Sequence, residues 1–120
     1  MNEVIIQYLK SKGRDISSLR GAVTKPIERL PSYYWALDKQ DSLSFLQLCM
    51  NHYIPIIGGD VIKVHKNESL LFADCHWYYD RVANECFYDY LIHSINKSKE
   101  YLQYYSNEDT VLFSFTLLDY

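Results

Sequence analysis

The sequence predicts an α+β fold: a mixed or antiparallel sheet of about four strands, two main helices on one face, and an additional N-terminal helix. The chain has 120 residues, the size of one ordinary domain, and its 48% hydrophobic content is enough for one core. Helical and strand-like segments follow one another as helix, then β-α-β-β-α-β, for which a split β-α-β arrangement is the simplest topology. We expect a single domain, residues 1–120, with an N-terminal helix and irregular segment in 1–31 and the α+β core in 32–120.

The N-terminal segment is expected to contribute one short helix. Residues 3–12 repeat apolar side chains on one side of such a helix, and Gly13 ends it. Residues 14–32 mix charges with glycine and proline, so we expect them to be mostly irregular. Because both longer helices are expected on one face of the sheet, the other face needs covering by this segment or by a partner.

The first strand is expected from Ser32 to Leu37, where "SYYWAL" is aromatic and strand-like, with Trp35 in the core. A helix follows in "DKQDSLSFLQLCMNHY", because either Asp38 or Asp41 can accept bonds from the free N–H groups at its start. Pro55 prevents its continuation. The apolar stripe of this helix consists of Leu43, Phe45, Leu46, Cys49, Met50 and Tyr53.

A glycine pair interrupts "IPIIGGDVIKV", which runs from Ile54 to Val64. A phosphate-binding loop needs several glycines followed by a helix start, whereas here a helix precedes the glycines and a strand follows. We therefore interpret Gly58 and Gly59 as architectural. Glycine tolerates positive φ, so the pair is expected to let the chain bend or bulge as it enters the strand, which positions Asp60.

The second half of the chain is expected to contain a hairpin, a long helix and a final strand. Residues 60–74 form the hairpin around the turn "KNES". Residues 75–85 connect it to a helix that Asn84 caps and that reaches about Tyr105. "TVLFSFTLLDY" is apolar on both faces, which indicates an interior strand. The stripe of the long helix consists of Phe87, Tyr90, Leu91, Ser94, Ile95, Ser98, Leu102 and Tyr105.

Composition and charge favour a cytoplasmic protein that does not bind nucleic acid. The net charge is −3, whereas a nucleic-acid-binding domain normally has a basic excess. The N-terminus has an acid at Glu3 and no basic start, unlike a secretory signal. No apolar run approaches the roughly 18 residues of a membrane span. Three cysteines without CxxC spacing do not suggest a disulfide framework.

The polar residues form no recognisable catalytic or metal-binding motif. Zinc needs about four ligands, usually in closely spaced pairs, and Cys75 with His76 is a single adjacent pair. Three cysteines and four histidines always offer Cys–His combinations, so these do not indicate a nucleophile. We therefore expect no metal and no cofactor, and the sequence shows no visible catalytic apparatus.

The unusual feature of the composition is its twelve tyrosines. "HWYYD", from His76 to Asp80, places four rings in a row that cannot all point inward. Tyr and Trp are enriched in protein-binding hot spots, and the surrounding acids argue against stacking on nucleic acid. Glu85 and Asp89 lie four residues apart on the expected helix, where the dipole also favours acids. Packing of these rings over the sheet edge and helix remains an equal alternative to an interface.

The stretch "WALDKQDSLSFLQLCMNHYIPIIGGDVIKV" resembles the immunity protein 40 family of bacterial polymorphic toxin systems. The likeness continues through the aromatic stretch around Trp77, the long helix "NECFYDYLIHSINKSKEYLQYYS" and the strand "VLFSFTLL", and it covers about residues 33–118. The positions that match the family pattern are Trp35, Gly58, Gly59, Asp60, Val61 and Trp77.

The resemblance implies a protein without enzymatic activity that binds a cognate protein toxin in the producing cell and neutralises it. The partner would present a basic surface, because complementary charge speeds capture and buried aromatic anchors slow release. The partner-binding residues expected on this basis are Asp60, Trp77, Tyr78, Tyr79, Asp80, Glu85 and Asp89.

Two other functions stay open at the level of the sequence. One is a small ligand-binding or enzymatic domain with a pocket near Gly58–Asp60 and His76; a deep polar pocket would favour it. The other is a subunit of a larger assembly, because an uncovered sheet face would be sticky.

Overall fold

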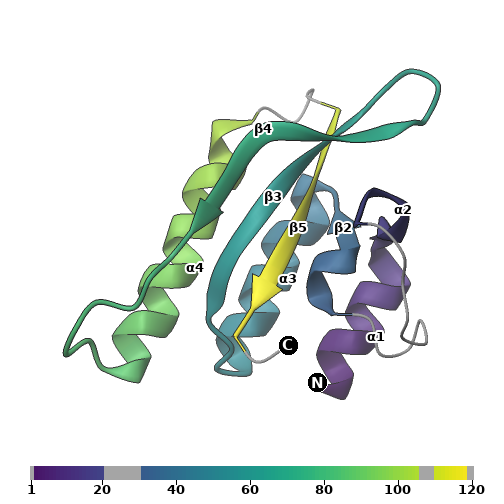
Figure 1. The fold of residues 1–120 in the computed structure, drawn as a ribbon. Coiled ribbons are helices and arrows are strands. Elements are labelled where there is room, and N and C mark those ends of the chain that lie inside the picture. The colour runs from purple at the N-terminus through teal and green to yellow at the C-terminus, as the bar shows by residue number, and fades with distance from the viewer. Residues whose placement is uncertain (1, 21–30, 106–109, 119–120) are drawn as a thin grey trace.

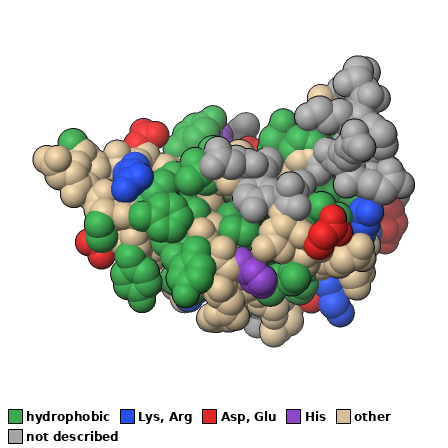
Figure 2. All heavy atoms as spheres, turned by 90° about the horizontal axis from the view of Figure 1, so that it is seen from below, with side chains coloured by type: hydrophobic (Ala, Val, Ile, Leu, Met, Phe, Trp, Pro, Cys, Tyr) green, Lys and Arg blue, Asp and Glu red, His purple; other side chains and the backbone are tan. Residues whose placement is uncertain are grey.

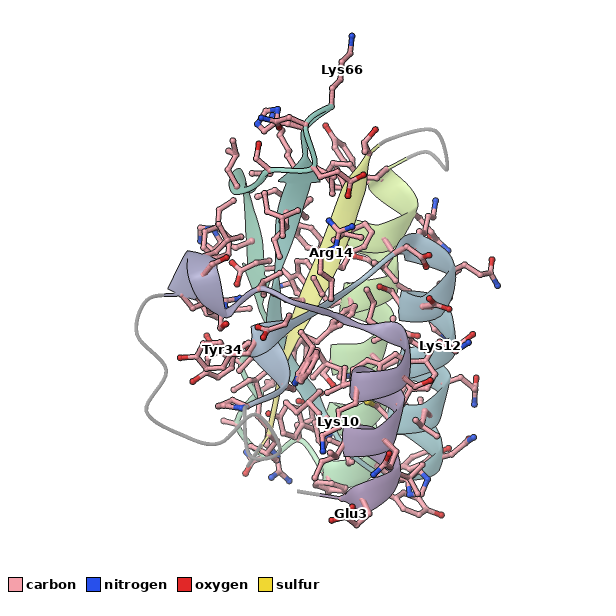
Figure 3. The ribbon with its side chains drawn as sticks, turned by 90° about the vertical axis from the view of Figure 1, so that its right-hand side faces the viewer. Glu3, Lys10, Lys12, Arg14, Tyr34 and Lys66 are labelled. Atoms are coloured by element: carbon pink, nitrogen blue, oxygen red, sulfur yellow. The ribbon has the colours of Figure 1, made fainter. Side chains whose placement is uncertain are left out.

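The computed structural model describes residues 2–20, 31–105 and 110–118, which form a sheet with helices on both faces (Figures 1 and 3). In this part of the chain the sheet has five strands in the order β1-β2-β5-β3-β4, and every neighbouring pair is antiparallel. The strands are β1 (Arg14–Asp15), β2 (Trp35–Leu37), β3 (Ile56–Val64), β4 (Leu70–Tyr78) and β5 (Val111–Leu117). The helices are α1 (Glu3–Lys12), α2 (Ser17–Arg20), α3 (Lys39–Asn51) and α4 (Phe87–Tyr104), with a 3-10 turn at Ser32–Tyr34.

The predicted α+β class is confirmed, and the number and order of strands differ in detail. The connection from β2 through α3 to β3 passes over β5, and that from β4 through α4 to β5 passes over β3. Each crossover therefore skips one strand, as a split β-α-β arrangement does. The interior position predicted for the last strand is also confirmed, because β5 pairs with β2 on one side and β3 on the other.

The main core lies between the sheet and helices α1, α3 and α4 (Figure 3). Alternate residues of β5 enter it, since Phe113, Phe115 and Leu117 are buried there while Ser114 faces the opposite side. The predicted stripe of the long helix is buried except at its two ends, where Phe87 is exposed and Tyr105 is half-buried. Trp35 lies in this core, 8% exposed.

The other face of the sheet is covered in part by the N-terminal segment. Ile16 is fully buried, and it packs with Leu19 against a second, smaller core that contains Ala36, Ile62 and Leu112. Residues 14–20 were expected to be irregular, but Arg14–Asp15 pair with β2 and Ser17–Arg20 form α2. Both elements are too short for a periodic pattern. The part of the expected irregular segment in 21–30 lies outside the described residues.

The helix starts follow the predicted cap in one case and not in the other. Asp38 caps α3, because its side chain accepts a hydrogen bond from the Asp41 N–H at 2.7 Å. Asn84 does not cap α4; it adopts φ = 67°, a left-handed conformation that asparagine tolerates well. The cap of α4 is Cys86, so Glu85 precedes the helix and does not share a helical face with Asp89.

The glycine pair lies inside β3 and is paired on both sides, not at a bend before the strand. Gly59 stands opposite Trp77 of β4 and Phe115 of β5. A methyl group built on Gly59 would overlap the Trp77 indole, with Cη2 at 2.5 Å. On Gly58, it would lie 2.5 Å from the Trp77 carbonyl oxygen. Both positions need glycine because neighbouring groups approach the backbone closely, and neither glycine adopts a left-handed φ in the structure.

We predict that Gly59→Ala destabilises the fold by about 1–3 kcal/mol, because the added methyl group displaces the indole from a filled core. The free energy of unfolding in urea measures this change. In a Trp77→Phe background the ring is smaller, so the same Gly59→Ala change should cost clearly less. Equal costs in both backgrounds would show that the contact between Gly59 and Trp77 does not set the requirement for glycine.

Candidate protein-binding surface

The aromatic run from His76 to Tyr79 is divided between the two faces of the sheet. It was expected to be a connection, but β4 continues to Tyr78, and side chains in a strand alternate. Trp77 points into the core and is 2% exposed, whereas Tyr78 on the opposite face is 68% exposed. The sequence predicted that these rings cannot all point inward, and this is confirmed.

Trp77 joins β4 to α4 and lies in the core, although it was expected to contact a partner. Its indole Nε1 donates a hydrogen bond to Ser98 Oγ at 3.1 Å, inside the buried layer. The ring stacks on Tyr101, with centroids 4.8 Å apart, and meets Phe115 edge-on. In this structure the ring is therefore unavailable to another molecule, and its role is to fix the two elements that carry the exposed residues.

The loop from Tyr79 to Cys86 is held by one buried carboxylate. Glu85 has only 7% of its side chain exposed. Tyr79 OH donates to its Oε2 at 2.8 Å, the Val82 N–H donates to its Oε1 at 3.2 Å, and His93 Nδ1 lies 2.5 Å from Oε2. Tyr79 also stacks on Tyr90 of α4. These contacts position the loop against the start of α4.

The same contacts shift the pKa values of Tyr79 and Glu85. Burial, followed by the hydrogen bond to Glu85 and the nearby negative charge, raises the pKa of Tyr79 to about 12. Burial alone would raise the pKa of Glu85, but hydrogen bonds from His93, Tyr79 and the Val82 N–H outweigh it, so its pKa lies below the ordinary value. At neutral pH the loop therefore holds a neutral phenol that donates to a carboxylate.

The outer side of this loop and the first turns of α4 present exposed apolar and acidic side chains together. Val82, Phe87 and Tyr88 are exposed, with Tyr88 at 59%. Asp80 in the loop and Asp89 in the first turn of α4 are exposed beside them. Figure 2 views the molecule from this end and shows hydrophobic side chains gathered on the side where the loop and the start of α4 lie. We call Tyr78–Asp89 the loop surface.

Asp60 lies apart from the loop surface, on the sheet face that α2 partly covers. Arg20 of α2 donates to its carboxylate at 2.9 Å and to Ser114 Oγ at 2.9 Å, and its guanidinium lies over the Tyr33 and Phe72 rings. This ion pair fastens α2 to the sheet. A hollow of about 240 Å³ lies beside it, lined by Arg20, Tyr33, Gly59, Asp60, His76, Trp77, Tyr78 and Thr116.

The structure thus brings Tyr78, Tyr79, Asp80, Glu85 and Asp89 together, with Asp60 joined to them only through Tyr78. Sequence reasoning missed Val82, Phe87 and Tyr88 as exposed members of this surface and Arg20 as the partner of Asp60. Phe87 was assigned to the buried stripe because it fits the helical period. No pattern in the sequence links Arg20 to Asp60, since the two belong to elements 40 residues apart.

Comparison with known proteins identifies a family. A model of the immunity protein 40 family matches residues 26–117 of this chain. No curated protein and no solved structure matches it. Among the described residues no helix is long and apolar enough to cross a membrane.

We predict that the contribution of Glu85 to stability depends on pH. Because its pKa is lowered in the folded chain, that contribution is present above its ordinary value of 4.5 and is lost as the pH falls through the folded value. The melting temperature of the wild type should therefore exceed that of Glu85→Gln at pH 7, and the difference should shrink toward pH 3.

Asp80→Asn is the control for this prediction, because it removes an exposed carboxylate from the same loop. It should leave the melting temperature at pH 7 close to that of the wild type. A gap between wild type and Glu85→Gln that stays constant from pH 7 to pH 3 would contradict the assigned role of Glu85.

Proposed function

The chain belongs to the immunity protein 40 family, and from this premise we propose that it binds a cognate protein toxin in the cytoplasm of the producing bacterium and neutralises it. The observation that carries the proposal is the extent of the family match, which covers residues 26–117 and so includes β2 to β5, α3 and α4. The toxin would belong to a polymorphic toxin system, and the chain would act by binding and not by catalysis.

The loop surface is the proposed contact region. Tyr78 and Tyr88 supply large exposed rings with polar tips, and such rings provide binding energy at little cost in side-chain entropy. Asp80 and Asp89 supply negative charge at the edge of the same region, which suits a toxin with a basic surface. Glu85 and Tyr79 hold the loop, so they would act on binding by positioning their neighbours.

The surroundings of Asp60 favour a structural role over the alternative of a ligand-binding site. Its carboxylate is occupied by Arg20, and the hollow beside it, at about 240 Å³, is smaller than the roughly 300–1,000 Å³ of small-molecule sites. We therefore propose that Asp60 organises the sheet face beside Tyr78, and that it contributes to toxin binding through that position.

We predict that co-expression with the toxin domain encoded beside this gene restores growth, and that the two proteins purify as a stable complex. Growth rescue and the stoichiometry of the purified complex are the measurements. A folded chain that neither rescues growth nor forms a complex would contradict the proposed function.

We further predict that Asp89→Lys weakens toxin binding, with a loss of about 1–3 kcal/mol if the acid faces a basic residue of the toxin. Glu3→Lys is a matched control, because Glu3 is also an exposed acid in the first turn of a helix. Its replacement by lysine therefore loses a similar interaction with the helix dipole. Glu3 lies on α1, outside the loop surface, so the Glu3→Lys variant should bind the toxin like the wild type. Titration calorimetry measures both variants, and equal affinities would remove Asp89 from the contact region.

A further inference from the structure

The outer edge of β4 is a long strand edge that no described residue pairs with. β4 is last in the sheet order and spans nine residues, from Leu70 to Tyr78. Natural proteins protect such an edge with charged residues, proline, a β-bulge or a covering element, or by keeping it short. β4 contains no lysine or proline, but Asp74 lies in it and its pairing with β3 is irregular between Phe72 and His76. The regular stretch from His76 to Tyr78 leaves an edge to which another strand can add.

The direction of the backbone groups identifies which positions are open. The Tyr79 N–H donates to the Ile57 carbonyl of β3 at 3.0 Å, so the backbone of Tyr79 points toward β3. Because alternate residues of an antiparallel strand point to opposite sides, Tyr78 and His76 direct their N–H and C=O groups outward. The Lys97 ammonium, which donates to the Tyr78 carbonyl, occupies the end of this edge.

A hollow of about 460 Å³ lies beside the same edge, between β4 and the second half of α4. It is lined by Cys75, Glu100, Tyr101, Tyr104 and Tyr105. Tyr104 is the most exposed of the large hydrophobic side chains described, at 81%. The described lining is thus mostly aromatic and includes the Glu100 carboxylate, and the hollow has room for a large side chain of a strand that runs along β4.

We propose that an extended segment of the toxin adds to β4 as a sixth strand of the described sheet. The segment would place a large apolar side chain in the hollow between Cys75 and Tyr104 and a basic residue against Glu100. This proposal rests on the proposed function and specifies how the toxin is held. One end of the β4 edge leads directly into the loop surface at Tyr78, so a single partner can contact both.

Charge favours the toxin over a second copy of this chain as the occupant. Residues 74–120 carry three basic and eight acidic residues, a net charge of −5. Pairing two copies edge to edge would bring the Glu100 side chains of the two hollows toward each other. A basic segment meets complementary charge at the same place.

The test compares His76→Pro with His76→Ala in the full chain. Both variants lose the imidazole, but only proline removes the outward N–H, and proline is tolerated where the N–H of an edge strand faces away from its neighbour. Melting temperature establishes that both are folded. We expect toxin affinity to fall about tenfold in His76→Pro relative to His76→Ala, and Tyr104→Ala to weaken binding as well.

Hydrogen exchange of the wild-type chain gives a readout that needs no variant. Toxin binding should slow exchange of the His76 and Tyr78 amides by about tenfold or more if a strand pairs with them. A stable complex with unchanged exchange at these amides, or equal affinities of folded His76→Pro and His76→Ala, would overturn strand addition and leave the proposed function intact. A free chain that is a dimer and becomes monomeric on His76→Pro would assign the edge to a second copy. No complex with the wild type would refute both proposals.

Discussion

The packing of the Trp77 indole across Gly59 is the contact on which the arrangement of the molecule depends. Only glycine leaves room for the ring to lie against β3, and from there the ring reaches Ser98 and Tyr101 of α4. Three elements are thereby fixed at one point of the core: β3, β4 and the middle of α4. The buried N–H of the indole is satisfied by the serine hydroxyl, so no unpaired donor offsets the gain from burying the ring.

The positions of the exposed side chains follow from that buried contact. Because Trp77 points inward, the strand alternation directs Tyr78 outward, and the chain then turns into the loop that Glu85 holds against α4. A nearly buried carboxylate with three hydrogen-bond partners is costly to move, so it gives the loop a defined shape at neutral pH. Surfaces that are shaped before binding lose less entropy on association, which suits the proposed role of capturing a toxin quickly and holding it.

The opposite face of the sheet is where the N-terminal segment is attached. The described N-terminal segment returns through β1 and α2, and Arg20 anchors it to Asp60 and Ser114 between two aromatic rings. Gly59 and Asp60 of "IIGGD" therefore have different roles on the two faces of one strand. Gly59 leaves room for the Trp77 indole on the helix side, and Asp60 binds Arg20 on the other.

Local patterns in the sequence determined the α+β class, both long helices, an acidic cap at Asp38 or Asp41 and the interior final strand, because hydrophobic periodicity and capping chemistry act over a few residues. The sequence also contains an alternation that indicates the extension of β4: Ala73, Cys75 and Trp77 alternate with Asp74, His76 and Tyr78. The polar residues of this stretch make the alternation hard to recognise as a strand. Tertiary structure alone decided that Trp77 is buried, that Asn84 forms a turn and Cys86 the cap, that Glu85 leaves the helix, and that Arg20 meets Asp60. Each of these depends on contacts between residues distant in sequence or on the exact point at which a helix begins, and no local preference specifies either.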